Sequence, residues 1–126
     1  MSGHPPSPPL GVHAALAALE RYQLQLRQLA RGGVDPELYH RVSVEVQEVR
    51  RCCHEVPALS ARWVALLIAH AELSQALWRT GQPQGAPTSA ERERLLGQVL
   101  GCVHALQRRC MELAGAAGAT PTDSSH

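Results

Sequence analysis

Residues 60–81, SARWVALLIAHAELSQALWRTG, decide the fold of this chain. They form its most apolar run, and Trp63 and Trp78 stand near the two ends. Apolar side chains recur around His70 at helical spacing, which predicts an amphipathic helix over residues 61–80. His70 and Glu72 interrupt the run before it reaches the roughly 18 apolar residues of a membrane span. We therefore expect a core helix, and no membrane partner.

Three further stretches carry a helical apolar stripe and predict helices at residues 8–31, 36–56 and 89–114. Gly32 suits the end of the first of them. Asp35 followed by Pro36 marks a helix start, because aspartate caps and proline fits the first helical turn. Thr88 and Glu91 form a capping box before the last helix. Each helix is therefore supported by a stripe and by a start or stop signal.

The second helix has a competing interpretation as a strand. Residues 42–46, VSVEV, alternate between apolar and polar, and valine favours sheets. The apolar stripe of the wider region is helical, however, with the Asp35 cap before it and Pro57 after it. We therefore expect a helix here.

Together these signals predict an all-α protein with a single domain. Apolar residues make up 44% of the 126-residue chain and aromatics only 3%, a composition typical of helix bundles built from leucine, valine and alanine. Short connections favour antiparallel neighbours. We expect an up-down-up-down four-helix bundle over residues 10–115, with a flexible proline-rich tail at 1–9 and a flexible polar tail at 116–126.

Charge and composition bear on partners and location. The formal net charge is +1 and the basic residues are spread along the chain, which argues against nucleic acid as a partner. The N-terminal stretch has no signal-peptide pattern, and the residue usage is typical of a GC-rich bacterial genome. We expect a bacterial, cytoplasmic protein with reduced cysteines and no cofactor.

One polar layer is predicted inside the apolar core. His70 lies at the centre of its helix's apolar stripe, and antiparallel packing places Glu45 and Tyr22 at the same level. The predicted role is a buried hydrogen-bonded network of Tyr22, Glu45 and His70 that sets the register of the bundle. The alternative is a metal or acid/base site with His70, Glu45 and a more distant Cys102 as ligands.

The adjacent Cys52 and Cys53 form a second candidate site. Their spacing matches no tight zinc motif, so buried cysteines acting as small apolar residues are the simpler interpretation. The alternative is a pair of reactive thiols that senses redox state, since Arg50 and Arg51 would lower the pKa of Cys52.

A second apolar flank runs along the helix at 61–80, beside the stripe that contains His70. Its members are Val64, Ile68, Ala71 and Trp78. Either neighbouring helices cover this flank, or it is an interface for a partner protein or for a second copy in a homodimer, with Trp78 as an anchor.

No catalytic motif is present: the chain has no glycine-rich phosphate loop, no GxSxG and no HExxH. We expect a non-catalytic helical-bundle protein that acts through protein–protein contacts, in a regulatory, adaptor or chaperone-like role, and that self-associates. The alternative is a bundle that senses metal ions or redox state through its buried His/Glu site or its cysteines.

Overall fold

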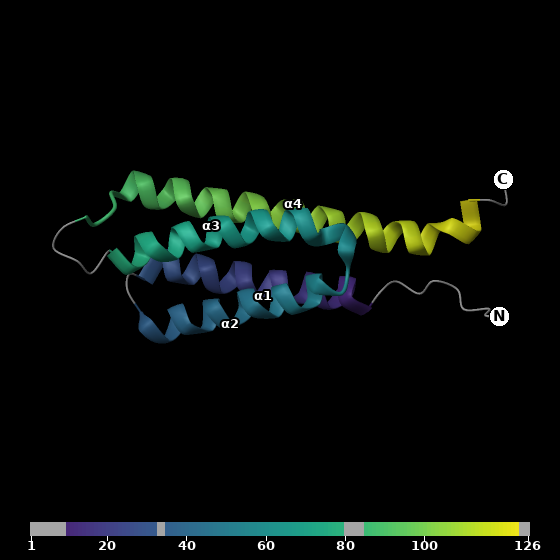
Figure 1. Ribbon diagram of the computed structural model, residues 1–126, viewed down its shortest axis with the longest axis horizontal. Helices are drawn as coiled ribbons and strands as arrows, with labels where there is room; N and C mark the ends of the chain where they lie inside the picture. The colour runs from purple at the N-terminus through teal and green to yellow at the C-terminus, as the bar shows by residue number, and fades with distance from the viewer. Residues whose placement is uncertain (1–9, 33–34, 80–84, 124–126) are drawn as a thin grey trace.

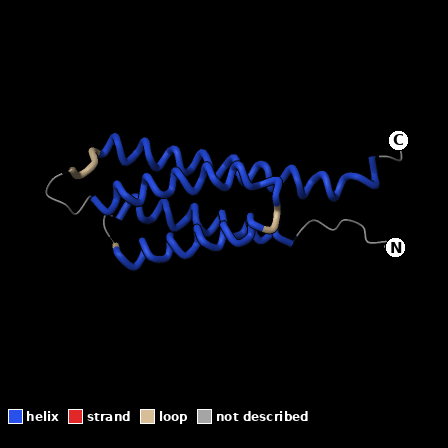
Figure 2. The backbone as a smooth tube through the Cα atoms, viewed as in Figure 1, coloured by secondary structure: helices blue, strands red, loops and turns tan. Residues whose placement is uncertain are grey.

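The computed structural model describes residues 10–32, 35–79 and 85–123. These residues form four α-helices and one short 3-10 helix. Figure 2 draws the helical segments in blue and the connecting loops in tan. The bounds are α1 Leu10–Gly32, α2 Pro36–His54, η1 Pro57–Leu59, α3 Ser60–Arg79 and α4 Ser89–Asp123. The described residues contain no strand, so the all-α prediction is confirmed and residues 42–46 are helical.

The four helices pack as a bundle in which consecutive helices run in opposite directions (Figure 1). α1 packs against α2 and α4, and α3 packs against α4. α2 and α3 touch each other much less, and α1 and α3 lie diagonally across the bundle. The structure is therefore two helical hairpins joined mainly through α1 and α4.

Each helix contributes one apolar stripe to a continuous core. The largest side chains that are fully buried include Leu19, Tyr22, Leu26, Leu66 and Leu106. The stripes follow the predicted helical spacing, because only one face of each helix can point inward in a bundle of this kind.

Two of the predicted helix starts are made by the expected side chains. A carboxylate oxygen of Asp35 accepts hydrogen bonds from the backbone N–H groups of Glu37, at 3.1 Å, and Leu38, at 3.4 Å. The Thr88 hydroxyl oxygen accepts from the backbone N–H of Glu91 at 3.0 Å. These bonds satisfy N–H groups that have no partner within their own helix.

The turn between α2 and α3 is tighter than a simple loop, because Pro57 begins the 3-10 helix η1. Val56 before it is extended (φ −126°, ψ 92°), as steric contact with a following proline requires. At the same end of the bundle, Gly11 of α1 lies so close to α2 that a Cβ there would meet Val56 Cγ2 at 3.0 Å and the Cys52 carbonyl oxygen at 3.3 Å. Glycine therefore permits this close approach of α1 and α2.

The helix ends differ from prediction most clearly in α4. Its predicted end is residue 114, whereas the helix continues to Asp123, so most of the stretch expected to be a flexible tail, residues 116–126, is helical. Alanine favours the helix in residues 114–119, AGAAGA, against Gly115 and Gly118, whereas local propensity does not explain the continuation past Pro121. Figure 1 shows the last turns of α4 projecting past the other helices. The predicted proline-rich tail at 1–9 lies outside the described residues.

Candidate functional site

A polar group from α1 meets two from α3 inside the bundle. The Tyr22 hydroxyl oxygen lies 2.7 Å from His70 Nδ1, and the other ring nitrogen, Nε2, lies 3.3 Å from Ser74 Oγ on the next turn of α3. The rings of Tyr22 and His70 are tilted by 53°, with centroids 5.6 Å apart. The structure thus brings together two members of the predicted layer and adds Ser74, whose i+4 spacing from His70 is the sequence signal for that contact.

These contacts fit a neutral His70 with its proton on Nε2. We assign the Tyr22 hydroxyl as donor to Nδ1 and the Nε2–H as donor to Ser74 Oγ, because with the reverse tautomer the proton of the fully buried Tyr22 hydroxyl would have no acceptor among these contacts. Burial lowers the pKa of His70, since a charged imidazolium loses hydration in the core. Burial also raises the pKa of Tyr22 well above its ordinary range. Both groups are therefore held neutral near pH 7.

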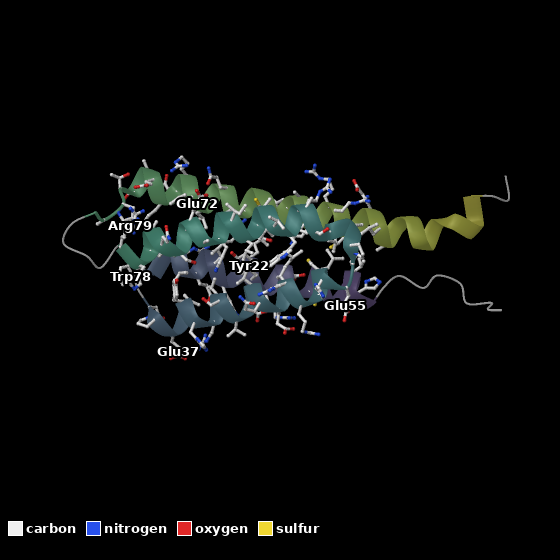
Figure 3. The ribbon with its side chains drawn as sticks, in the orientation of Figure 1. Tyr22, Glu37, Glu55, Glu72, Trp78 and Arg79 are labelled. Carbon is white, nitrogen blue, oxygen red and sulfur yellow. The ribbon has the colours of Figure 1, made fainter. Side chains whose placement is uncertain are left out.

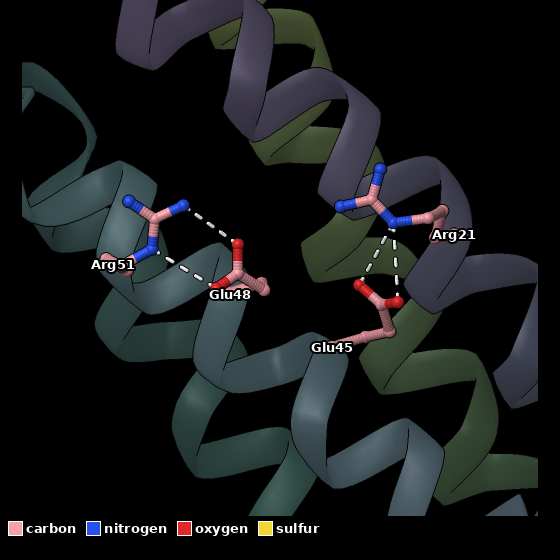
Figure 4. A network of polar contacts seen from close by, with 4 residues as sticks. All are labelled: Arg21, Glu45, Glu48 and Arg51. Carbon is pink, nitrogen blue, oxygen red and sulfur yellow. Dashed lines mark hydrogen bonds and ion pairs between the residues drawn. The ribbon is translucent and has the colours of Figure 1, made fainter.

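Glu45 does not join this layer. Its carboxylate pairs with Arg21 of α1, whose Nε lies 3.2 and 3.3 Å from the two carboxylate oxygens (Figure 4). α2 packs closely against α1 and only slightly against α3, so the side of α2 that carries Glu45 faces Arg21. The predicted contact between Glu45 and His70 is wrong for this reason. A second pair, Glu48 and Arg51, lies nearby on α2, and its hydrogen bonds hold the pKa of Glu48 below its usual value.

The proposed metal ligands are not assembled. Glu45 is paired with Arg21, and both ring nitrogens of His70 have hydrogen-bond partners. Within residues 10–32, 35–79 and 85–123, no group of three or more His, Cys, Asp or Glu side chains is placed to hold a metal ion. The described side chains therefore do not form the site that His70, Glu45 and Cys102 would make together.

The vicinal cysteines are both buried, and all four cysteines of the chain are free thiols. Burial raises the pKa of Cys53 to about 12. Burial also raises the pKa of Cys52, an effect that exceeds the lowering by Arg51. The expectation of a depressed pKa for Cys52 is therefore wrong: Arg51 acts in the predicted direction, but burial of the thiol raises its pKa by more.

A polar cluster that was not predicted joins α1 to α4. Gln23 Nε2 lies 3.4 Å from His104 Nε2, and Gln107 Nε2 donates to Gln23 Oε1 at 3.3 Å. Recognising it from sequence would require knowing that α1 lies beside α4, since Gln23 and Gln107 are more than 80 residues apart.

The outer face of α3 is rich in exposed large hydrophobic residues. Seven large hydrophobic residues are exposed among the described residues, and four of them belong to α3: Val64, Leu67, Ile68 and Trp78. Val64 is 47% exposed, Ile68 58% and Trp78 69%. Neighbouring helices therefore leave uncovered the flank singled out in the sequence, including Ala71, which is also exposed.

Two hollows border this face. One lies between α2 and the end of α3 and is lined by Tyr39, Ser74, Gln75, Trp78 and Arg79. Figure 3 places Trp78 and Glu37, from the start of α2, at this same end of the bundle. The other is an apolar groove between α3 and α4, where Ile68 and Ala65 face Gly101 and Ala105. The exposed face of α3 thus extends sideways toward both neighbouring helices.

Comparison with known proteins finds no matching family, no significantly similar curated protein and no significantly similar solved structure. Among the described residues, none of the helices combines the length and the apolar character needed to cross a lipid bilayer.

Proposed function

We propose that this protein is a small non-catalytic helical bundle that acts through protein–protein contacts in the cytoplasm, in a regulatory, adaptor or chaperone-like role, and that it self-associates. The single observation that carries the proposal is the uncovered apolar face of α3. The largest contiguous apolar patch on a protein surface is often a functional interaction site.

The anchor of this surface is Trp78. Tryptophan is among the residues most enriched at binding hot spots, and a hollow beside its ring, lined by Tyr39 and Gln75, is open to a partner side chain. Because α3 is already folded and packed on α4, binding through its outer face requires little ordering of the backbone.

Sensing of metal ions or redox state has less support. The carboxylate of Glu45, the acidic ligand of the metal-site alternative, forms an ion pair with Arg21. Burial raises the pKa of the Cys52 and Cys53 thiols. The Tyr22, His70 and Ser74 contacts fit a hydrogen-bonded layer that fixes the packing of α3 in the core.

Sedimentation equilibrium tests the proposal at concentrations up to about a hundred micromolar. We expect the natural chain to associate reversibly and Ile68→Asp to shift it to monomer, because the substitution places a charge in the apolar face. Val44→Asp is the matched control, since Val44 is similarly exposed but lies on α2. A natural chain that remains monomeric would contradict the proposed self-association. Association that persists unchanged in Ile68→Asp would show that the outer face of α3 is not the binding surface.

A further inference from the structure

The exposed residues of α3 follow the spacing of a coiled-coil seam. Alternate steps of three and four residues connect them, and each is exposed: Ala61, Val64, Ile68, Ala71, Gln75 and Trp78. The mean step of 3.5 residues is the heptad period, in which such positions meet a facing helix. The core residues Leu66 and Leu73 take the heptad position opposite the seam. α3 therefore has one face for the bundle and a second, regular face for another helix.

The order of large and small residues along this seam is self-complementary. If a second α3 packs antiparallel about a two-fold axis between residues 69 and 70, Trp78 of each copy meets Ala61 of the other. In the same arrangement Val64 meets Gln75, and Ile68 meets Ala71. Each layer then joins a large side chain to a smaller or flexible one, as efficient packing requires. Parallel packing would instead set Trp78 against Trp78 and Ala61 against Ala61, leaving one layer crowded and another empty.

The size and charge of the seam also suit a second copy. It spans about 25 Å of helix and contains no charged residue. Val64, Ile68 and Trp78 of the seam, together with the adjoining Leu67, expose on the order of 400 Å² per copy, so two copies with their alanines and Gln75 approach the roughly 1,200 Å² at which specific interfaces begin. Antiparallel packing also opposes the two helix dipoles favourably. An interface at the low end of the size range is typical of weak, reversible association.

We infer that the exposed face of α3 binds a second copy of this chain through an antiparallel, two-fold α3–α3 contact with Ile68 opposite Ala71 and Trp78 opposite Ala61. This inference rests on the proposed function, because it takes the same face of α3 as the binding surface. It adds the direction of the partner's helix and the register of the contact.

Disulfide cross-linking tests the direction and the register. Val64→Cys and Gln75→Cys are each introduced into the full chain in a Cys102→Ala background, which removes the cysteine that is only partly buried. In the inferred dimer, position 64 of one copy faces position 75 of the other, whereas two copies of position 64 are about 16 Å apart. A disulfide requires Cα atoms within about 7 Å.

We expect a mixture of the two variants, under mild oxidation, to form at least five-fold more linked dimer than either variant alone. Peptide mass spectrometry should identify the linkage as 64 to 75, and circular dichroism should show that both variants keep the helical content of the natural chain. Linking within each variant alone would overturn the antiparallel register while leaving α3 as the binding surface. No linking, together with monomeric sedimentation of the natural chain, would overturn the second copy as partner. Association that resists Ile68→Asp would instead show that the outer face of α3, the observation behind the proposed function, is not the binding surface.

Discussion

The Tyr22 hydroxyl lies 2.7 Å from His70 Nδ1 and thereby joins α1 to α3, the two helices that face each other diagonally across the bundle. Tyr22 is completely buried, so its hydroxyl has no access to solvent as an alternative partner. We expect Tyr22→Phe to lower the free energy of unfolding by about 1–2 kcal/mol, because the substitution leaves His70 Nδ1 without its donor. Urea unfolding of the natural chain and the variant measures the difference.

Ser74→Ala is the matched comparison for this contact. Ser74 accepts from the other ring nitrogen over a longer distance, 3.3 Å, so we expect a smaller loss, below about 1 kcal/mol. A Tyr22→Phe variant as stable as the natural chain would show that the hydroxyl contributes nothing to packing across the diagonal.

The unfolding free energy should depend on pH through His70. Burial lowers the pKa of His70 in the folded state, so the unfolded chain binds this proton more readily. The contribution of His70 to the free energy of unfolding is therefore fully present above the ordinary histidine pKa of about 6.5. It is lost as the pH drops below that value toward the lower pKa of the folded state. Urea titrations between about pH 5 and 7 should show this loss.

His70→Gln is the control for the pH dependence, because it keeps a polar side chain but does not titrate. We expect the variant to lose less stability than the natural chain over the same range. Parallel pH curves for the two proteins would contradict the assignment of the effect to His70.

The buried thiols should react slowly with iodoacetamide near neutral pH. Burial raises the pKa of Cys52, Cys53 and Cys110, which leaves little of the reactive thiolate. We expect these three to remain unmodified in the folded protein and Cys102, which is only partly buried, to react first. Mass spectrometry of the alkylated protein counts the modified sites, and a denatured sample in which all four react is the control. Fast modification of Cys52 in the folded protein would restore the thiol-sensor interpretation.

Two glycines in helices should respond oppositely to alanine. A methyl group at Gly11 meets Val56 Cγ2 at 3.0 Å and a backbone oxygen at 3.3 Å, so Gly11→Ala should cost about 1–3 kcal/mol. Gly97 has no atom within 4 Å of the added carbon, so Gly97→Ala should stabilise α4 by about 0.5–1 kcal/mol. Thermal and urea unfolding compare the two variants. Equal effects would show that the close approach of α1 and α2 is not what requires glycine at position 11.

The helices themselves could be predicted because their signals are local in the chain. Asp35 and Pro36 start α2, Thr88 caps α4, and the apolar stripe of each helix identifies its buried face. The extension of α4 to Asp123 could not be predicted in the same way, because alanine in its last turns favours a helix whereas glycine and Pro121 oppose one.

The sequence by itself therefore determined the number of helices, their starts and the inward faces that include Tyr22 and His70. Only the tertiary structure decided that Glu45 turns to Arg21, that Cys52 is buried and that the outer face of α3 stays uncovered. These features depend on how closely each pair of helices packs and how each helix is rotated about its axis. Those quantities are set by contacts between residues far apart in the chain, which the periodicity of a single helix does not encode.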